Sequence, residues 1–141
     1  MKAVEDASHA DARRMRGKGG EDAAARLLER SGMRILARNW RCGRLELDVV
    51  CQDGETLVFV EVRTRSRGGL VSPAESLTPA KRRNFMRAAR AYLAKSGEWD
   101  RPCRFDFVCV LDAGATLELE HHRHVDLTEF MGGGNTSWQP W

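Results

Sequence analysis

Residues 45–65 read LELDVVCQDGETLVFVEVRTR, and this stretch decides the fold. It contains two runs in which apolar and polar residues alternate, Leu45 to Gln52 and Leu57 to Arg65. Alternation with a period of two is typical of β-strands that bury one face. The Asp53-Gly54 pair between the runs is a strong signal for a two-residue turn. The sequence therefore predicts an antiparallel hairpin that turns at Asp53-Gly54.

This turn fixes which residues face each other across the predicted hairpin. Glu46 lies opposite Glu61 with Asp48 diagonal to both, while the odd-numbered residues of the first run share the apolar face. Like charges directly opposite each other are unfavourable on a sheet, so three converging carboxylates need a compensating cation. A hard divalent metal such as Mg²⁺ or Mn²⁺ fits oxygen ligands of this kind. A polar hairpin face that is simply solvated is the alternative.

Helices are predicted on both sides of this hairpin in the sequence. Residues 21–30 are rich in alanine, have apolar residues at helical spacing and are followed by Gly32 as a stop signal. Thr78 and Pro79 supply an N-cap and a first-turn proline for a second helix, which ends near Ser96-Gly97.

The remaining strands complete an α/β pattern. The order is helix, three strands, helix and two strands, which predicts a sheet with the second helix as a crossover connection. The further strands are expected at Arg34 to Arg41, Arg104 to Asp112 and Thr116 to Val125, with a short terminal helix at Asp126 to Phe130.

Length and composition indicate one domain. The 141 residues are 42% hydrophobic and 30% charged, which suits a single folded unit and is too apolar for a disordered chain. We expect a disordered leader at 1–16, one domain at 17–130 and a flexible tail at 131–141. The polar start and the lack of a long apolar run argue against a signal peptide or a membrane span, so we expect a cytoplasmic protein with no membrane partner.

Charge is unevenly distributed along the chain. Residues 13–44 hold ten Lys and Arg against three Asp and Glu, and residues 63–104 hold eleven against three. Residues 45–62, between these basic blocks, hold five carboxylates and no Lys or Arg. This pattern indicates a polyanionic partner such as nucleic acid, with a solvated arginine-rich surface as the alternative.

Charged side chains on the two helices extend this pattern. Glu21 shares a face with inward-facing apolar residues of the first helix, although it also suits the dipole at the helix N-terminus. On the second helix, Lys81 lies on the apolar arc. The opposite face carries a stripe suited to phosphate contacts, or to plain solvation, formed by Arg83, Arg87 and Arg90.

The cysteines and histidines give weaker signals. The cysteines at 42, 51, 103 and 109 contain no Cys-x-x-Cys pair, and two of them lie in apolar runs, so we expect buried free thiols rather than a zinc site or disulfides. The histidines at 121, 122 and 124 are expected at an exposed polar strand end rather than in a metal site.

Several short motifs together resemble the YraN-type family, which has an endonuclease-like fold. The resemblance covers roughly residues 17–130 in consistent order. That family is similar in turn to archaeal Holliday-junction resolvases and to the restriction-endonuclease-like PD-(D/E)xK group. The motifs are Gly20-Glu21, RNWR at 38–41, ELDVV at 46–50, FVEVRTR at 59–65, Lys81 and RFDFV at 104–108.

This resemblance implies a restriction-endonuclease-like three-layer core, with a mixed central sheet of about five strands flanked by helices. In the wider group a helix Glu, a strand Asp and a Glu-x-Lys hold Mg²⁺ and cut phosphodiester bonds. By position, the implied metal ligands are Asp48 and Glu61, with Glu21 and Glu46 close to the metal. The other implied functional residues are Arg63 and Lys81, which stabilise transition-state charge, and Arg65, Arg83, Arg87 and Arg90, which bind nucleic acid.

The chain departs from the nuclease pattern at two positions. Arg63 stands where the wider group has lysine, and its pKa is too high for it to release a proton near neutrality. Leu45 precedes Glu46 where the family more usually has glycine. Asp106, in the last motif, has either a functional role or the structural one of holding a strand end or an arginine.

Three functional hypotheses follow. The leading one is a Mg²⁺-dependent (or Mn²⁺-dependent) endonuclease-like protein acting on DNA phosphodiester bonds, at branched or otherwise unusual structures. A homodimer would let it cut both strands of a duplex symmetrically. The second hypothesis is a non-catalytic nucleic-acid-binding module on the same fold, and the third is a scaffold whose arginine-rich helix meets an acidic protein.

Overall fold

The computed structural model describes residues 19–66 and 73–127. The predicted leader at 1–16 and tail at 131–141 lie outside these residues, as does most of the predicted helix at 126–130. Neither of the longer helices in the described part is both long and apolar enough to cross a membrane.

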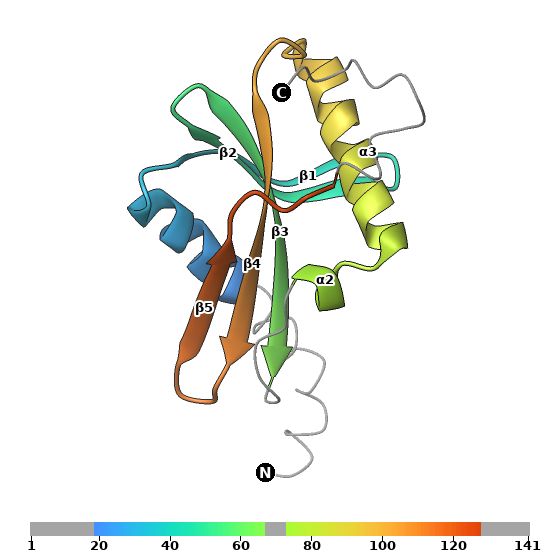
Figure 1. The fold of residues 1–141 in the computed structure, drawn as a ribbon. Helices are drawn as coiled ribbons and strands as arrows, with labels where there is room; N and C mark the ends of the chain where they lie inside the picture. The colour runs from blue at the N-terminus through green and yellow to red at the C-terminus, as the bar shows by residue number, and fades with distance from the viewer. Residues whose placement is uncertain (1–18, 67–72, 128–141) are drawn as a thin grey trace.

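The described residues form a mixed five-stranded sheet with helices on both sides, as predicted (Figure 1). The strands lie in the order β1-β2-β3-β4-β5; β3 and β4 are parallel, and the other neighbours are antiparallel. After a helix at residues 19–30, the elements are β1 (Arg34–Cys42), β2 (Leu45–Asp53), β3 (Thr56–Ser66), α2 (Pro73–Ser76), α3 (Pro79–Ser96), β4 (Cys103–Asp112) and β5 (Leu117–His122).

Local sequence signals set the ends of α3, as predicted. The Thr78 side-chain oxygen accepts a hydrogen bond from the backbone N–H of Lys81 at 3.3 Å, and Pro79 occupies the first turn. Gly97 ends the helix in the left-handed conformation, at a φ of 71° that glycine adopts easily. Between these ends α3 provides the crossover that the parallel β3–β4 pair requires.

The two long helices cover opposite faces of the sheet and make three layers (Figure 1). Ala24 and Leu28 of the N-terminal helix pack on one face, against a cluster that includes Val60 of β3. On the other face Phe85 of α3 packs against a cluster that includes Phe59 of β3. The middle of β3 is therefore buried from both sides, and polar side chains at its end are held firmly.

The hairpin forms, but the predicted register is wrong by two residues. Asp53 pairs with Thr56 and Val49 pairs with Val60, so the turn residues are Gly54 and Glu55. Gly54 has a φ of +61°, which the turn requires. Extending this register by one residue places Asp48, and not Glu46, beside Glu61.

The regular alternation of side chains between the two faces of the sheet breaks down in the middle of β2. Leu47 and Val50 belong to the cluster under α3, whereas Val49 belongs to the cluster under the N-terminal helix. The prediction that odd-numbered residues of β2 share one face is therefore wrong on either side of Asp48. The neighbouring strand, β1, is distorted at the same position along the sheet, where Asn39 has a φ of +51°. Asp48 thus lies where two strands change face together.

All four cysteines are free thiols, as predicted. Cys51, Cys103 and Cys109 are buried. Burial raises the pKa of both Cys51 and Cys103 to about 12, so these thiols are unreactive at neutral pH.

Candidate functional site

The candidate site lies where β2 separates from β3. The backbone pairing of the two strands ends at Val49 and Val60, and beyond it the Asp48 side chain accepts a hydrogen bond in place of a backbone carbonyl. The backbone N–H of Val62 donates a hydrogen bond to Asp48 Oδ2 at 2.8 Å. A carboxylate thus replaces the missing backbone acceptor, which fixes its position in the fork between the strands.

Asp48 and Glu61 form a carboxyl pair that shares a proton. The Glu61 carboxyl donates a hydrogen bond to the Asp48 carboxylate. Burial, followed by the charge of Asp48, raises the pKa of Glu61 to about 8. Burial is also the largest cause that raises the pKa of Asp48. The pair therefore holds a proton at neutral pH because two close, buried carboxylates cannot easily ionise together.

Close packing of a helix end against β3 brings Glu21 to this pair. Gly20 is buried, and a Cβ at this position would clash with the side-chain oxygen of Thr64. The adjacent Glu21 accepts a hydrogen bond from the Asn39 side chain. Burial and the nearby Asp48 charge raise the pKa of Glu21. Glu21 is thus half-buried and lies near enough to Asp48 for the two charges to interact.

Arg63 lies beside the carboxyl pair, whereas Glu46 lies at the edge of the site. Arg63 Nε lies 3.8 Å from Glu61 Oε1, where its charge lowers the pKa of Glu61 without offsetting burial. This buried nitrogen makes no hydrogen bond to any described residue. Glu46 is mostly exposed and forms an ion pair with Arg41 at 3.4 Å. Glu46 therefore lies at the edge of the site, and the predicted Glu46–Glu61 opposition does not occur.

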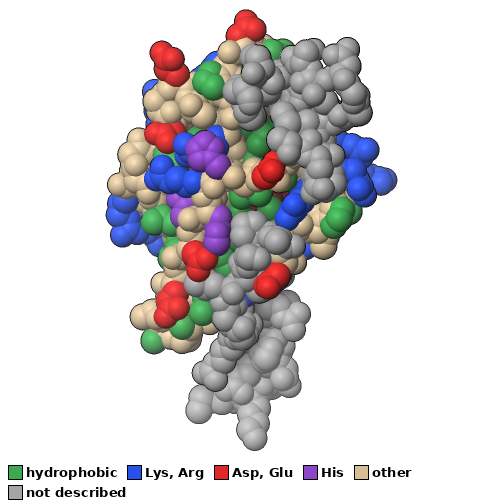
Figure 2. Space-filling view, in the orientation of Figure 1, with side chains coloured by type: hydrophobic (Ala, Val, Ile, Leu, Met, Phe, Trp, Pro, Cys, Tyr) green, Lys and Arg blue, Asp and Glu red, His purple; other side chains and the backbone are tan. Residues whose placement is uncertain are grey.

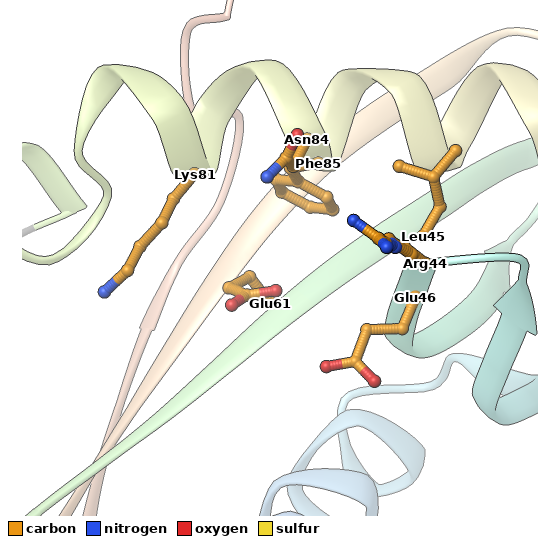
Figure 3. A pocket seen from close by; sticks show the side chains of 7 residues that line it. All are labelled: Arg44, Leu45, Glu46, Glu61, Lys81, Asn84 and Phe85. Carbon is orange, nitrogen blue, oxygen red and sulfur yellow. The ribbon is translucent and has the colours of Figure 1, made fainter.

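A cavity of about 180 Å³ opens between α3 and the start of β2, with Glu61 at its floor (Figure 3). Lys81 and Asn84 extend from α3, and Arg44 approaches from the opposite side. Within the described part of the chain, neither Lys81 nor Arg44 forms an ion pair. The residues that line the cavity are Arg44, Leu45, Glu46, Glu61, Lys81, Asn84 and Phe85.

The donor set of the pair fits a hard divalent cation. Mg²⁺ is commonly bound through one or two carboxylates, with water and substrate phosphate at its remaining positions. Asp48 and Glu61 supply two such carboxylates, and their raised pKa values show that positive charge there is insufficient. Among residues 19–66 and 73–127, no group of three or more His, Cys, Asp or Glu side chains is placed to hold a metal. The residues thus fit a two-carboxylate site.

The predicted nucleic-acid-binding arginines lie apart from this cavity. Arg83 and Arg87 are exposed on α3, as expected for an outward stripe, and Arg90 is half-buried. Figure 2 shows Lys and Arg side chains gathered at the edge of the molecule where α3 lies. Arg65 donates a long hydrogen bond to Ser76 Oγ at 3.4 Å and is half-buried. The structure therefore does not bring these four arginines together with the carboxyl pair.

Three polar residues of the site were not predicted from the sequence. Arg44 lies in the tight connection between β1 and β2, and Asn84 lies one turn after Lys81 on α3. The helical spacing of Asn84 from Lys81 could have indicated a shared face. Asn39 had only a weak signal, since asparagine adopts left-handed backbone more readily than most residues.

A second polar cluster is buried between β4 and β5. Asp106 is fully buried, and Arg104 Nε donates to its Oδ1 at 2.9 Å. His121 Nε2 lies 2.7 Å from Asp106 Oδ2, and its side chain is only 10% exposed. These contacts lower the pKa of Asp106 despite burial. The prediction of an exposed histidine strand end is therefore wrong for His121, although His124 is exposed. Asp106 does hold an arginine in place.

Comparison with known proteins gives the family. A family model described as "Uncharacterised protein family UPF0102" matches residues 20–110. A UPF0102 protein of Nitratidesulfovibrio vulgaris is 60% identical over 132 residues, which cover 93% of this chain and 98% of that protein. A UPF0102 protein of Lawsonia intracellularis is 52% identical over 126 residues, which cover 89% and 96% respectively. The resemblance to the YraN-type family is thus confirmed, and the chain belongs to the UPF0102 family.

Proposed function

We propose that this protein is a Mg²⁺-dependent (or Mn²⁺-dependent) nuclease-like protein that binds DNA and hydrolyses its phosphodiester bonds. Asp48 and Glu61 would hold the ion, with Glu21 beside them and Glu46 at the edge of the site. Action at branched or otherwise unusual DNA structures, and a homodimer that cuts both strands, remain predictions within this proposal.

One observation supports the proposal most strongly. Charges of both signs line one cavity without neutralising each other: Glu61 retains a proton, while Lys81 and Arg44 form no ion pair within the described residues. Lys81 is half-buried, where an unpaired charge is costly, whereas Arg44 is exposed. A ligand that combines a cation with an anion satisfies both sets, and a divalent metal with a phosphate is such a ligand.

The residues of the site have different roles in the proposed reaction. A bound divalent ion supplies positive charge that polarises a phosphate and makes water more acidic. Asp48 is held by the Val62 N–H and by its hydrogen bond with Glu61, so its carboxylate would be fixed in place for an ion. Glu61 must lose its proton when the ion binds, and it can pass that proton to solvent because it is 19% exposed. Arg63 and Lys81 stabilise negative charge on the reacting phosphate.

Arg63 restricts what the site can do. An arginine stays protonated, so it orients a phosphate but does not act as a general base. Proton removal from water would then depend on the carboxylates and the ion. The alternative function is a non-catalytic nucleic-acid-binding module. Arginine in the lysine position, together with only two directly contacting carboxylates in the described part of the chain, favours that alternative.

Cleavage assays separate the two functions. Purified protein is incubated with labelled duplex, single-stranded and four-way-junction DNA in Mg²⁺ or Mn²⁺. We expect cleavage by the wild type and by Glu55→Gln, which removes an exposed carboxylate from the hairpin turn, and none by Asp48→Ala. Wild-type cleavage no greater than that of Asp48→Ala would refute the enzymatic function. Salt-dependent DNA binding that needs no metal and persists in Glu61→Ala would then support the binding module.

A further inference from the structure

Two sets of cations could guide a nucleic acid to the carboxyl pair, and they lie on different sides of α3. Lys81 faces the cavity, whereas Arg83 and Arg87 are exposed. At 3.6 residues per turn, Arg83 lies about 160° around the helix axis from Lys81, and Arg87 about 120° from it. With side chains, a helix is roughly 10–12 Å across. One short stretch of strand seated in the cavity therefore cannot contact both sets.

The cations that line the cavity are better placed to bind a phosphate than those on the outer face of α3. Lys81, Asn84 and Arg44 line the cavity together with Glu61; Figure 3 shows Lys81 and Asn84 on α3 and Arg44 beside the start of β2. Neither cation is neutralised by a described residue. Arg44 is exposed, as Arg83 and Arg87 are, so what distinguishes the cavity residues is that two cations and an amide line one cavity together with Glu61.

The dimensions of the cavity indicate which part of a nucleic acid it takes. Pockets that enclose a drug-sized ligand measure roughly 300–1,000 Å³, whereas this cavity measures about 180 Å³. Among the described residues that line the cavity, the aromatic side chain is Phe85, which is 3% exposed, so these residues offer no face on which a base could stack. A phosphate with an associated ion fits the available space and charge, and a flipped base does not.

We propose, building on the function above, that Arg44, Lys81 and Asn84 form a phosphate-binding subsite for the sugar–phosphate backbone. The subsite holds a phosphate within the strand beside the carboxyl pair, and it reads backbone charge rather than base identity. The strand thus runs between α3 and the start of β2, and the outer arginines of α3 do not contact it. This path differs from the one that the arginine stripe predicts from sequence.

The test compares matched exposed substitutions on the two sides of α3. Binding of fluorescent oligo-dT and oligo-U, each about 20 nucleotides long, is measured by anisotropy at several salt concentrations. Ca²⁺ replaces Mg²⁺ so that an oxygen-liganded ion is present. Arg44→Gln and Asn84→Ala alter the cavity, Arg83→Gln and Arg87→Gln alter the outer face, and Lys95→Gln in the last turn is the neutral control.

We expect Arg44→Gln to weaken binding and to reduce the slope of log K against log salt by about 0.7, the value for one phosphate contact on a single strand. Asn84→Ala should weaken binding with little change in slope, because its amide is neutral. Arg83→Gln and Arg87→Gln should behave like the control. Equal effects with oligo-dT and oligo-U indicate backbone recognition, while loss with only one of them assigns the subsite to DNA or to RNA.

Two outcomes overturn these proposals in distinguishable ways. Wild-type binding that depends on Arg83 and Arg87 but not on Arg44 would refute the cavity path and leave the proposed function standing. Failure of the wild type to bind either oligonucleotide, even at low salt, would refute the proposed function together with the subsite.

Discussion

Glu61 makes the stability of the fold depend on pH, because its protonated form is compatible with burial and its ionised form is not, and one conservative substitution removes this dependence. Its pKa is about 8 in the folded protein and 4.5 ordinarily, so the folded state keeps a proton that the unfolded state loses between these values. The stabilising effect is complete below about pH 4.5 and disappears as pH rises through about 8. At 1.36 kcal/mol per pH unit, the difference amounts to about 5 kcal/mol.

Glu61→Gln tests this reasoning because glutamine keeps the shape of the side chain but cannot ionise. The amide can still donate a hydrogen bond to the Asp48 carboxylate. We expect the variant and the wild type to have similar free energies of unfolding near pH 5. Near pH 9 the variant should be several kcal/mol more stable, because only the wild type must bury a second carboxylate charge.

The assay is urea denaturation in metal-free buffer at intervals from about pH 5 to pH 9, with Glu55→Gln as the control. Glu55 is exposed in the hairpin turn, so its substitution should leave the pH dependence unchanged. Curves of stability against pH that stay parallel for Glu61→Gln and the wild type would show that Glu61 does not hold its proton in the folded state, and would refute the description of the pair.

Three further substitutions test how the fold positions the site, each by chemical denaturation. Gly20→Ala should cost about 1–3 kcal/mol through its clash with Thr64, and adding Thr64→Ala should recover part of that loss; no recovery would locate the cost elsewhere. Asp106→Asn should cost about 3–5 kcal/mol because it removes the fully buried charge partner of Arg104, although Asp53 still contacts that guanidinium at 2.9 Å, whereas Asp53→Asn, at a 36% exposed carboxylate, should cost much less. Thr78→Ala should cost about 1 kcal/mol by removing a helix cap, and an unchanged stability would contradict that role.

Local signals predicted most of the fold. The caps of α3 and its crossover role follow from Thr78, Pro79 and Gly97, whose backbone preferences act within a few residues. The alternating runs likewise predicted β2 and β3 to within a residue or two. These features depend on chemistry that neighbouring residues share, so a single sequence is enough to reveal them.

The hairpin register could not be predicted from the same pattern. A slip of two residues keeps every side chain on its original face, so alternation does not distinguish a turn at Asp53-Gly54 from one at Gly54-Glu55. The structure has the second turn, and the Gln52 side chain donates a hydrogen bond to the Gly54 carbonyl oxygen at 2.9 Å. This small difference moves the partner of Glu61 from Glu46 to Asp48.

Long-range contacts explain the other features of the structure that could not be predicted from the sequence. The change of face around Asp48 occurs together with the left-handed Asn39 on the neighbouring strand, and no local signal connects the two positions. His121 likewise looks like a polar strand end in the sequence. It is nearly buried because Asp106, fifteen residues earlier, provides a partner in the folded chain. The carboxylates of the candidate site were singled out from the sequence, whereas Arg44, Asn84 and Asn39 were not, and the arrangement of the site depends on these distant pairings.

The carboxyl pair is central to this account, and calorimetric titration of Mn²⁺ into the metal-free protein near pH 7 tests it most directly. We predict one saturable site, at least tenfold weaker in Asp48→Asn than in the wild type and unchanged in Glu55→Gln. Binding should release a proton from Glu61, so the measured heat should vary with the ionisation enthalpy of the buffer. An absence of saturable binding, or binding that Asp48→Asn leaves unchanged, would contradict the proposed metal site.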